Sequence, residues 1–119
     1  MGAGGIERMQ PITWPEFEKV HLCVGTVLSV DDLPNARKPA YVLTIDFGPC
    51  GMKRSSAQIT VHYTKEDLIG RQVVAVINFP PKQIGSVMSE CLVTGFPDVN
   101  GDIVLTSLER PLPNGARLR

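Results

Sequence analysis

The chain has 119 residues with 12 basic and 12 acidic side chains, so its formal net charge is zero. This length suits one domain with a modest core, and the balance of charge excludes a protein that is basic throughout. Any basic binding site must therefore be a local patch. No apolar stretch reaches the roughly 20 residues that cross a bilayer, and residues 1–10 lack the apolar centre of a signal peptide. We expect a cytoplasmic protein without membrane insertion.

The first third of the chain predicts a tail, a short helix and a strand. Residues 1–13 are expected to be a flexible N-terminal tail that precedes a single domain of residues 14–119. Trp14-Pro15 followed by acidic residues predicts a short helix over residues 14–19, because proline and negative charge both favour the first turn. Alternating apolar residues predict a strand over 21–32, with Gly25 marking a bend, and LPNARKP predicts a loop.

Five more strands follow in the pattern. Residues 41–47 alternate and predict the second strand. Residues 56–63 have the cleanest alternation, with one apolar face and one polar face, and predict the third strand. Thr64 and Asp67 predict a capped helix that ends at Gly70. Residues 71–79 and 89–96 predict buried strands, Asn100-Gly101 predicts a turn within residues 98–102, and residues 103–108 predict a last strand.

This order of elements predicts the fold class. Three strands, a short helix and at least two further strands are typical of an all-β protein built as a five-stranded Greek-key barrel, the OB-fold. Such a barrel removes the exposed strand edges that a small all-β domain would otherwise present. The N-terminal helix and the proline-rich C-terminus are then extensions at the two ends of the barrel.

Catalysis is a weak hypothesis for this sequence. His21 and His62 stand alone on predicted strands, and the sequence has no nucleophile elbow, HExxH or phosphate-binding glycine loop. Cys23, Cys50 and Cys91 are widely spaced, so we expect reduced, mostly buried thiols. We therefore predict a protein that is not an enzyme and uses no cofactor.

The sequence disfavours two possible metal sites. His21 with the three cysteines offers four soft ligands, but their spacing matches no common zinc pattern. A calcium loop would begin at Asp98 and would need glycine where Ile103 stands, so the hairpin turn is the preferred interpretation. The acidic and amide residues at its calcium-ligand positions are Asp98, Asn100, Asp102 and Glu109.

Binding is the stronger hypothesis, because basic residues cluster by topology. They lie in the loop before the second strand, at the start of the third strand and after the fourth strand, next to the face where OB-folds usually bind their ligands. The polar side chains of the third strand could face the same surface, although ordinary solvated charges remain an open alternative. The five basic residues are Arg37, Lys38, Lys53, Arg54 and Lys82, and the polar row is Ser56, Gln58, Thr60 and His62.

The aromatic residues refine this binding hypothesis. Phe47, Tyr63 and Phe79 fit apolar core positions, which leaves Tyr41 as the ring most expected at the surface. Proteins that bind single strands by stacking normally expose more rings. The sequence therefore favours recognition of the shape and backbone of a folded RNA.

Several segments, in order and spacing, resemble one family: DLPNARKPAYVLTIDFG, SSAQIT, VVAVINFPPKQIG, SECLV and PNG. They are similar to the CsaA family of export-related, chaperone-like proteins, within the wider family of tRNA-binding domains, over roughly residues 14–119. The resemblance implies an OB-fold homodimer that binds tRNA or tRNA-like structured RNA and unfolded or pre-secretory polypeptide. An alternative stays open, in which the protein is mainly a polypeptide chaperone with little tRNA affinity.

The resemblance also implies site residues around the NFPPKQIGSVMSECLV segment. The RNA-binding positions of the wider family fall on Asn78, Pro81, Lys82 and Ser89, and Glu90 is characteristic of the CsaA branch, where it would orient Lys82 or Arg54 or bind an amino group. Proline cannot donate to a sheet ladder, so Pro80 and Pro81 should force the chain out of the barrel and present Lys82.

This sequence departs from its relatives at several positions near Lys82. Pro80, Gln83 and Met88 replace lysine or other basic residues, and Gly85-Ser86 replaces an Arg-Gly pair. Fewer phosphate contacts imply weaker and less salt-sensitive RNA binding. Met88 instead adds apolar surface that could contact a polypeptide or simply pack in the core.

Dimer formation is implied for the two extensions. Trp14, Phe17 and Val20 on the N-terminal segment, together with the region after residue 103, would form the interface. An alternative, in which the N-terminal helix covers one end of the barrel, stays open.

Overall fold

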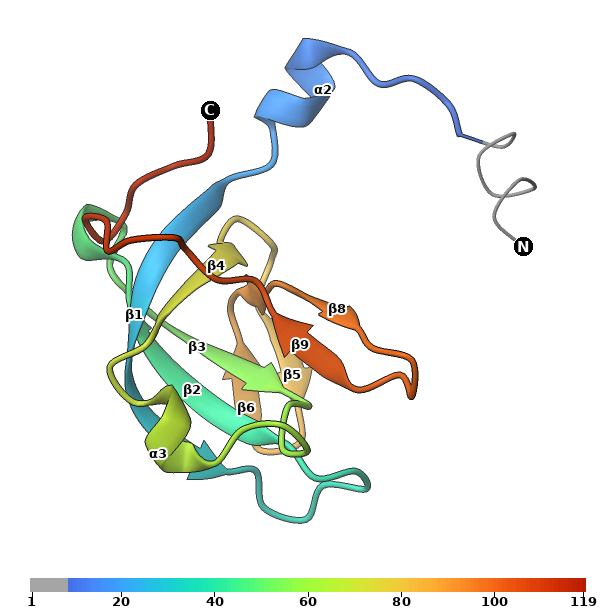
Figure 1. Cartoon of the computed structure of the whole chain (residues 1–119), viewed down its shortest axis with the longest axis vertical. Helices are drawn as coiled ribbons and strands as arrows, with labels where there is room; N and C mark the ends of the chain where they lie inside the picture. The colour runs from blue at the N-terminus through green and yellow to red at the C-terminus, as the bar shows by residue number, and fades with distance from the viewer. Residues whose placement is uncertain (1–8) are drawn as a thin grey trace.

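A computed structural model describes residues 9–119 and shows one antiparallel barrel with two extensions. The predicted tail of residues 1–13 lies mostly outside the described residues, and its flexibility stays a prediction. The five-stranded sheet has the order β3-β2-β1-β4-β7 (Figure 1). Its strands are β1 (Leu22–Asp32), β2 (Tyr41–Asp46), β3 (Met52–Ala57), β4 (Gln72–Val76) and β7 (Leu92–Val93), and the short helix α3 (Lys65–Leu68) lies between β3 and β4.

The remaining elements are short and lie around this barrel. Two hairpins, β5 (Lys82–Ile84) with β6 (Val87–Ser89) and β8 (Gly95–Pro97) with β9 (Ile103–Leu105), form separate two-stranded sheets. The helix α2 (Trp14–Glu18) projects from the barrel, and the 3-10 turn η1 (Gly48–Cys50) joins β2 to β3. The nearly closed, five-stranded barrel confirms the predicted OB-type fold.

Apolar side chains from the barrel strands fill the interior of the barrel and form the core. The alternation predicted for residues 41–47 is confirmed, because Leu43, Ile45 and Phe47 are completely buried. Gly25 permits close packing, because a Cβ atom there would lie 2.6 Å from side-chain atoms of Ile45 and Phe47. The bend predicted at this position stays a prediction. The other fully buried apolar side chains are Val27, Leu68, Val73 and Ala75.

Both predicted helix starts are confirmed by capping boxes. The Thr13 hydroxyl accepts the amide of Glu16, whose carboxylate in turn accepts the amide of Thr13 at 2.8 Å. Thr64 and Asp67 make the same reciprocal pair at the start of α3. Such pairs satisfy amides that lack partners in the first helical turn, so they depend only on local sequence.

The third strand lies earlier in the chain than its alternation predicted: β3 runs from Met52 to Ala57, so only the first two residues of the predicted 56–63 belong to it. The structure ends β3 at Ala57, which pairs with Tyr41, and residues 60–62 form a turn. The physical reason is the partner strand, because Pro39, two residues before β2, has no amide to donate to the ladder. Of the predicted polar row, only Ser56 lies on a strand, whereas Gln58, Thr60 and His62 follow it.

Two other predicted strands are interrupted. Residues 71–79 form a strand only to Val76, because Val76 pairs with Leu22, the first residue of β1. Residues 89–96 are divided among β6, β7 and β8, which pair with three different partners. The predictions for two rings were also wrong: Tyr41 is 8% exposed, and Phe79 is 53% exposed.

Candidate nucleic-acid interface

A groove with two connected hollows runs across one side of the barrel. The first, of about 510 Å³, lies between Phe79, Lys82 and the end of β3. The second, of about 410 Å³, lies along the loop between β1 and β2 and includes Arg37 and Lys38. Both hollows share Ser56, Gln58 and Ile84, so we treat them as one surface and call it the basic groove.

The structure brings together three of the five predicted basic residues in this groove. Arg37, Lys38 and Lys82 line it and are exposed. Arg54 lies on β3 two residues before Ser56, so the alternation of a strand places it on the same outer face. Lys53 has the opposite orientation, on the side of the buried Ser55, and does not line the groove.

The charges of these basic residues are not neutralised within the described chain. The ion pairs among residues 9–119 are His62–Asp98, Lys65–Asp32 and Arg110–Glu109. None of them involves the five predicted basic residues. A cation without a protein partner keeps its hydrogen-bond donors available for an anionic ligand such as phosphate.

Asn78 supports the groove rather than facing it. Its Oδ1 atom accepts the amide of His21 at 3.0 Å, and its Nδ2 atom donates to the carbonyl of Lys19 at 2.6 Å. These two bonds tie the end of β4 to the residues before β1. The Asn78 side chain is therefore already engaged within the chain, and it fixes the backbone immediately before Phe79.

Ser89 and Glu90 close the barrel. The Ser89 hydroxyl accepts the amide of Ser56 at 3.1 Å, and the Glu90 carboxylate accepts the amide of Arg54 at 2.9 Å. The amide of Glu90 also donates to the Arg54 carbonyl at 2.8 Å. These bonds continue the ladder from β3 to the segment before β7. Glu90 thus binds the Arg54 backbone instead of orienting a basic side chain.

The proline pair separates the barrel from the hairpin, as predicted. Pro80 and Pro81 are exposed and lie outside any strand, and β5 begins at the next residue, Lys82. Lys82 pairs with Ser89 across the β5–β6 hairpin, which holds it at the edge of the groove. The prediction that this segment presents Lys82 at the surface is confirmed.

Phe79 is the groove residue that the sequence interpretation missed. It follows a run of apolar residues, and this pattern predicts a core position. One available signal was its position directly before two prolines, where a strand cannot continue. Its exposed ring forms one wall of the groove together with Leu92.

Among the candidate metal ligands, Cys91 lines the basic groove, and the others lie apart from it. Cys23 and Cys91 are buried and Cys50 is exposed, so the prediction of mostly buried thiols holds for two of the three. The predicted turn at 98–102 is confirmed, because one Asp98 oxygen accepts the amides of Asn100 and Asp102. The other Asp98 oxygen lies 2.7 Å from Nε2 of His62, and these contacts hold the pKa of Asp98 below its ordinary value of 3.8.

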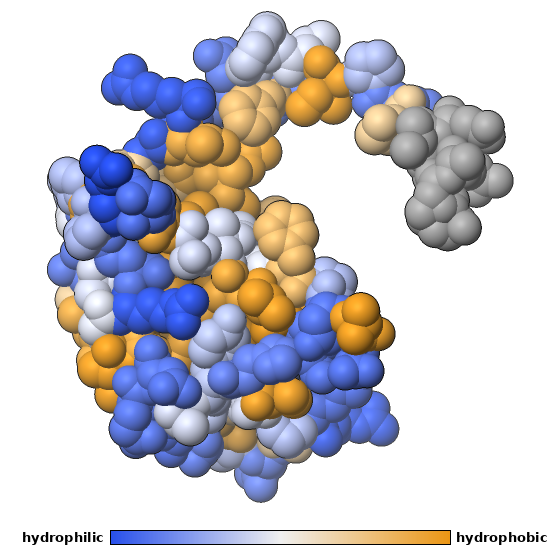
Figure 2. Space-filling model, viewed as in Figure 1, coloured by the Kyte–Doolittle hydropathy of each residue, from blue (hydrophilic) through white to orange (hydrophobic). Residues whose placement is uncertain are grey.

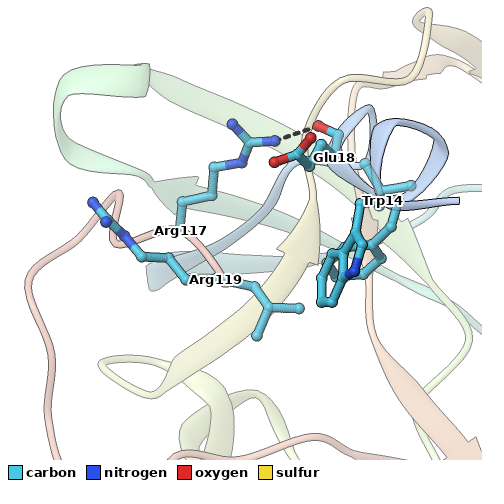
Figure 3. A pocket seen from close by; sticks show the side chains of 7 residues that line it. Trp14, Glu18, Arg117 and Arg119 are labelled. Carbon is cyan, nitrogen blue, oxygen red and sulfur yellow. Dashed lines mark hydrogen bonds between the residues drawn. The ribbon is translucent and has the colours of Figure 1, made fainter.

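A separate hollow, outside the basic groove, lies between α2 and the C-terminus. It has a volume of about 610 Å³ and is lined by Trp14, Phe17, Val20 and the last three residues of the chain (Figure 3). The Arg117 guanidinium donates to the carbonyl of Glu18, which ties the two extensions together. We call this region the terminal hollow. Figure 2 shows apolar side chains below the projecting helix.

The helix α2 does not cover the barrel end. No residue of α2 is buried, and the Trp14 side chain is 75% exposed. The alternative of an N-terminal lid is therefore wrong for this chain. Within the described residues, no helix is long and apolar enough to cross a membrane.

Barrel and groove together define a small OB-type binding domain with a basic surface. The sequence profile of a family described as "Putative tRNA binding domain" matches residues 22–117. The chain belongs to this family.

Solved structures and curated relatives add detail. The chaperone CsaA of Bacillus anthracis is 47% identical, with a TM-score of 0.85, and the match covers 92% of this chain and 100% of that one. The CsaA chaperone protein of Picrophilus torridus is 43% identical, with a TM-score of 0.84 and the same coverage. The methionine–tRNA ligase of Methanothrix thermoacetophila is 34% identical over 119 residues, which is 99% of this chain and only 17% of the ligase. The resemblance to CsaA and to tRNA-binding domains is confirmed.

Proposed function

We propose that this chain binds tRNA or tRNA-like structured RNA through the basic groove and acts as a CsaA-type binding protein rather than as a catalyst. The observation that carries the proposal is the convergence of Arg37, Lys38 and Lys82 on one groove. The membership in a tRNA-binding family supports it. A cytoplasmic location follows from the proposed ligand and belongs to the same proposal.

The proposed contacts differ from the RNA-binding residues that the sequence and the resemblance predict. Lys82, Arg37, Lys38 and Arg54 would neutralise phosphates, because their charges are free within the described chain. Asn78 and Glu90 would act indirectly, by holding the groove wall in place, whereas Ser89 is itself part of that wall. Phosphate contacts give affinity that falls with salt, so RNA binding should weaken as ionic strength rises.

A titration with labelled tRNA at low and physiological salt tests this proposal. Replacing Lys82 by alanine should weaken binding and lower the slope of affinity against salt by about one unit, because one phosphate contact is lost. Lys19→Ala removes the same charge outside the groove and should change neither quantity. Equal effects of both variants would reject the groove and leave only diffuse attraction.

We further propose that the chain forms a homodimer through the terminal hollow. Trp14 and Val20 are 75% and 40% exposed, and Leu118 beside them is 52% exposed. Exposed apolar side chains gathered in a hollow commonly mark an interface between proteins. The intact chain should elute at twice its mass of 13.0 kDa, and Trp14→Ala should shift it toward the monomer.

A chaperone function is the second candidate. Large apolar side chains are also exposed away from the terminal hollow, including Met88 at 44% and Leu92 at 53%, and solved neighbours are named as chaperones. We propose that such surfaces bind unfolded or pre-secretory polypeptide. The test is whether the protein slows the aggregation of an unfolded preprotein. If it does so without binding tRNA at low salt, the polypeptide is the main ligand.

A further inference from the structure

The exposed ring of Phe79 stands in a position that the chain holds firmly. Directly before it, the two Asn78 hydrogen bonds attach the backbone to His21 and Lys19. Directly after it, Pro80 and Pro81 restrict the backbone because their rings fix φ. An aromatic side chain on a restricted backbone loses little conformational entropy when it binds a planar group.

The surroundings of Phe79 combine apolar and polar groups. Leu92 and Ile84 provide apolar walls, and Lys82 provides an unpaired positive charge three residues along the chain. Gln58 is exposed at the junction of the two hollows. A side-chain amide offers both donors and an acceptor, as the edges of nucleobases do.

The groove is also longer than one planar group needs. Beyond Gln58 it continues into the hollow that contains Arg37 and Lys38. Positive charge is therefore available at both ends of the groove, with the aromatic ring near one end. This arrangement matches a backbone of linked phosphates that carries a base between them.

We propose that the basic groove holds an unpaired nucleotide of RNA, with its base stacked on Phe79, its edge near Gln58 and its neighbouring phosphates at Lys82 and Arg37. This inference rests on the proposed RNA-binding function and narrows its ligand to unpaired segments such as loops or ends. The bases of a continuous duplex cannot reach Phe79, because their faces are covered by stacking. The proposed nucleotide site replaces the expectation that the protein recognises only the shape and backbone of a folded RNA.

Two labelled RNAs of equal length test the inference, one an unstructured single strand and one a blunt duplex. The full chain should bind the single strand more tightly, and Phe79→Leu should weaken that binding about ten-fold, the loss expected for one stacked base. Phe79→Tyr keeps a ring and should bind as the original protein does. Phe96→Leu is the matched control, because Phe96 is 70% exposed and lies outside the groove.

The possible results separate this inference from the proposed function. If Lys82→Ala weakens RNA binding while Phe79→Leu does not, the chain binds RNA but holds no stacked nucleotide. Equal affinity for the single strand and the duplex would also overturn the inference, and this comparison needs no substitution. If neither RNA binds and an unfolded polypeptide does, both the RNA function and the nucleotide are rejected.

Discussion

The residues around the basic groove form two groups, and the sequence alone does not distinguish them because both are polar or charged. Asn78, Ser89 and Glu90 are engaged in hydrogen bonds that hold the barrel together, whereas Lys82 and Arg37 have no ionic partner within residues 9–119. We call the first group the closure residues. The comparison shows that one binding motif can contain two kinds of residue. Some hold the groove in shape through hydrogen bonds, and others are free to contact the ligand. Stability and binding measurements should separate the two groups.

The largest effect is expected for a thiol behind the closure residues. Burial raises the pKa of Cys91 to about 11 from an ordinary value of 9.0. The thiolate is the reactive form, so at neutral pH a thiol reagent should label Cys91 roughly 100-fold more slowly than an ordinary thiol. Cys50 is exposed and should react first. Mass spectrometry of the native protein after brief labelling should find the modification at Cys50, and rapid labelling of Cys91 would show that the closure is open.

The next largest effect is expected for removal of the closure itself. The double variant Ser89→Ala/Glu90→Ala loses the acceptors for the amides of Ser56 and Arg54. The free energy of unfolding should fall by about 2 kcal/mol, because each lost hydrogen bond costs about 1 kcal/mol. Urea denaturation measures this change.

Lys82→Ala is the matched comparison for the closure variant. Lys82 is exposed and has no ion pair, so its loss should change stability by less than about 0.5 kcal/mol. A double variant as stable as the original protein would show that Ser89 and Glu90 belong with the ligand contacts after all.

A smaller effect is expected at Asn78. Asn78→Asp keeps an oxygen for the amide of His21 but removes the donor to the carbonyl of Lys19. Stability should fall by about 1 kcal/mol, and binding of the single-stranded RNA should weaken as well, because Phe79 loses its support. Asn100→Asp, in the β8–β9 turn, is the control for the added charge. If only stability changes, the position of Phe79 does not depend on Asn78.

The smallest effect is expected from the exposed pair outside the groove. The pKa of Asp98 is lowered first by its hydrogen bond with His62 and then by backbone amides. Its contribution to stability is therefore present above pH 3.8, the ordinary pKa, and is lost as the pH falls through the lower pKa of the folded protein. Asp98→Asn should flatten this acid decline in unfolding measurements, and Asp31→Asn should not. An unchanged profile in Asp98→Asn would remove this pair as its cause.

Local patterns were sufficient for several elements. The capping boxes at Thr13 and Thr64 depend on residues three positions apart, and the turn at Asp98 uses its own neighbouring amides. The alternation from Tyr41 to Phe47 predicts that Leu43 and Ile45 share one face of β2, because successive side chains point to opposite faces of a strand. The caps and the turn depend only on contacts within a few residues.

Other features depended on partners far away in the sequence. The third strand ends where Pro39 leaves it no partner, although its own pattern continues to Tyr63. The hydrogen bonds of Ser89 and Glu90 join residues 33 and 36 positions apart, and no local pattern contains them. Composition and order of elements determined the barrel and the basic surface of this protein. Only the tertiary structure decided which polar residues close that barrel and which ring faces the groove, because both depend on pairing between distant strands.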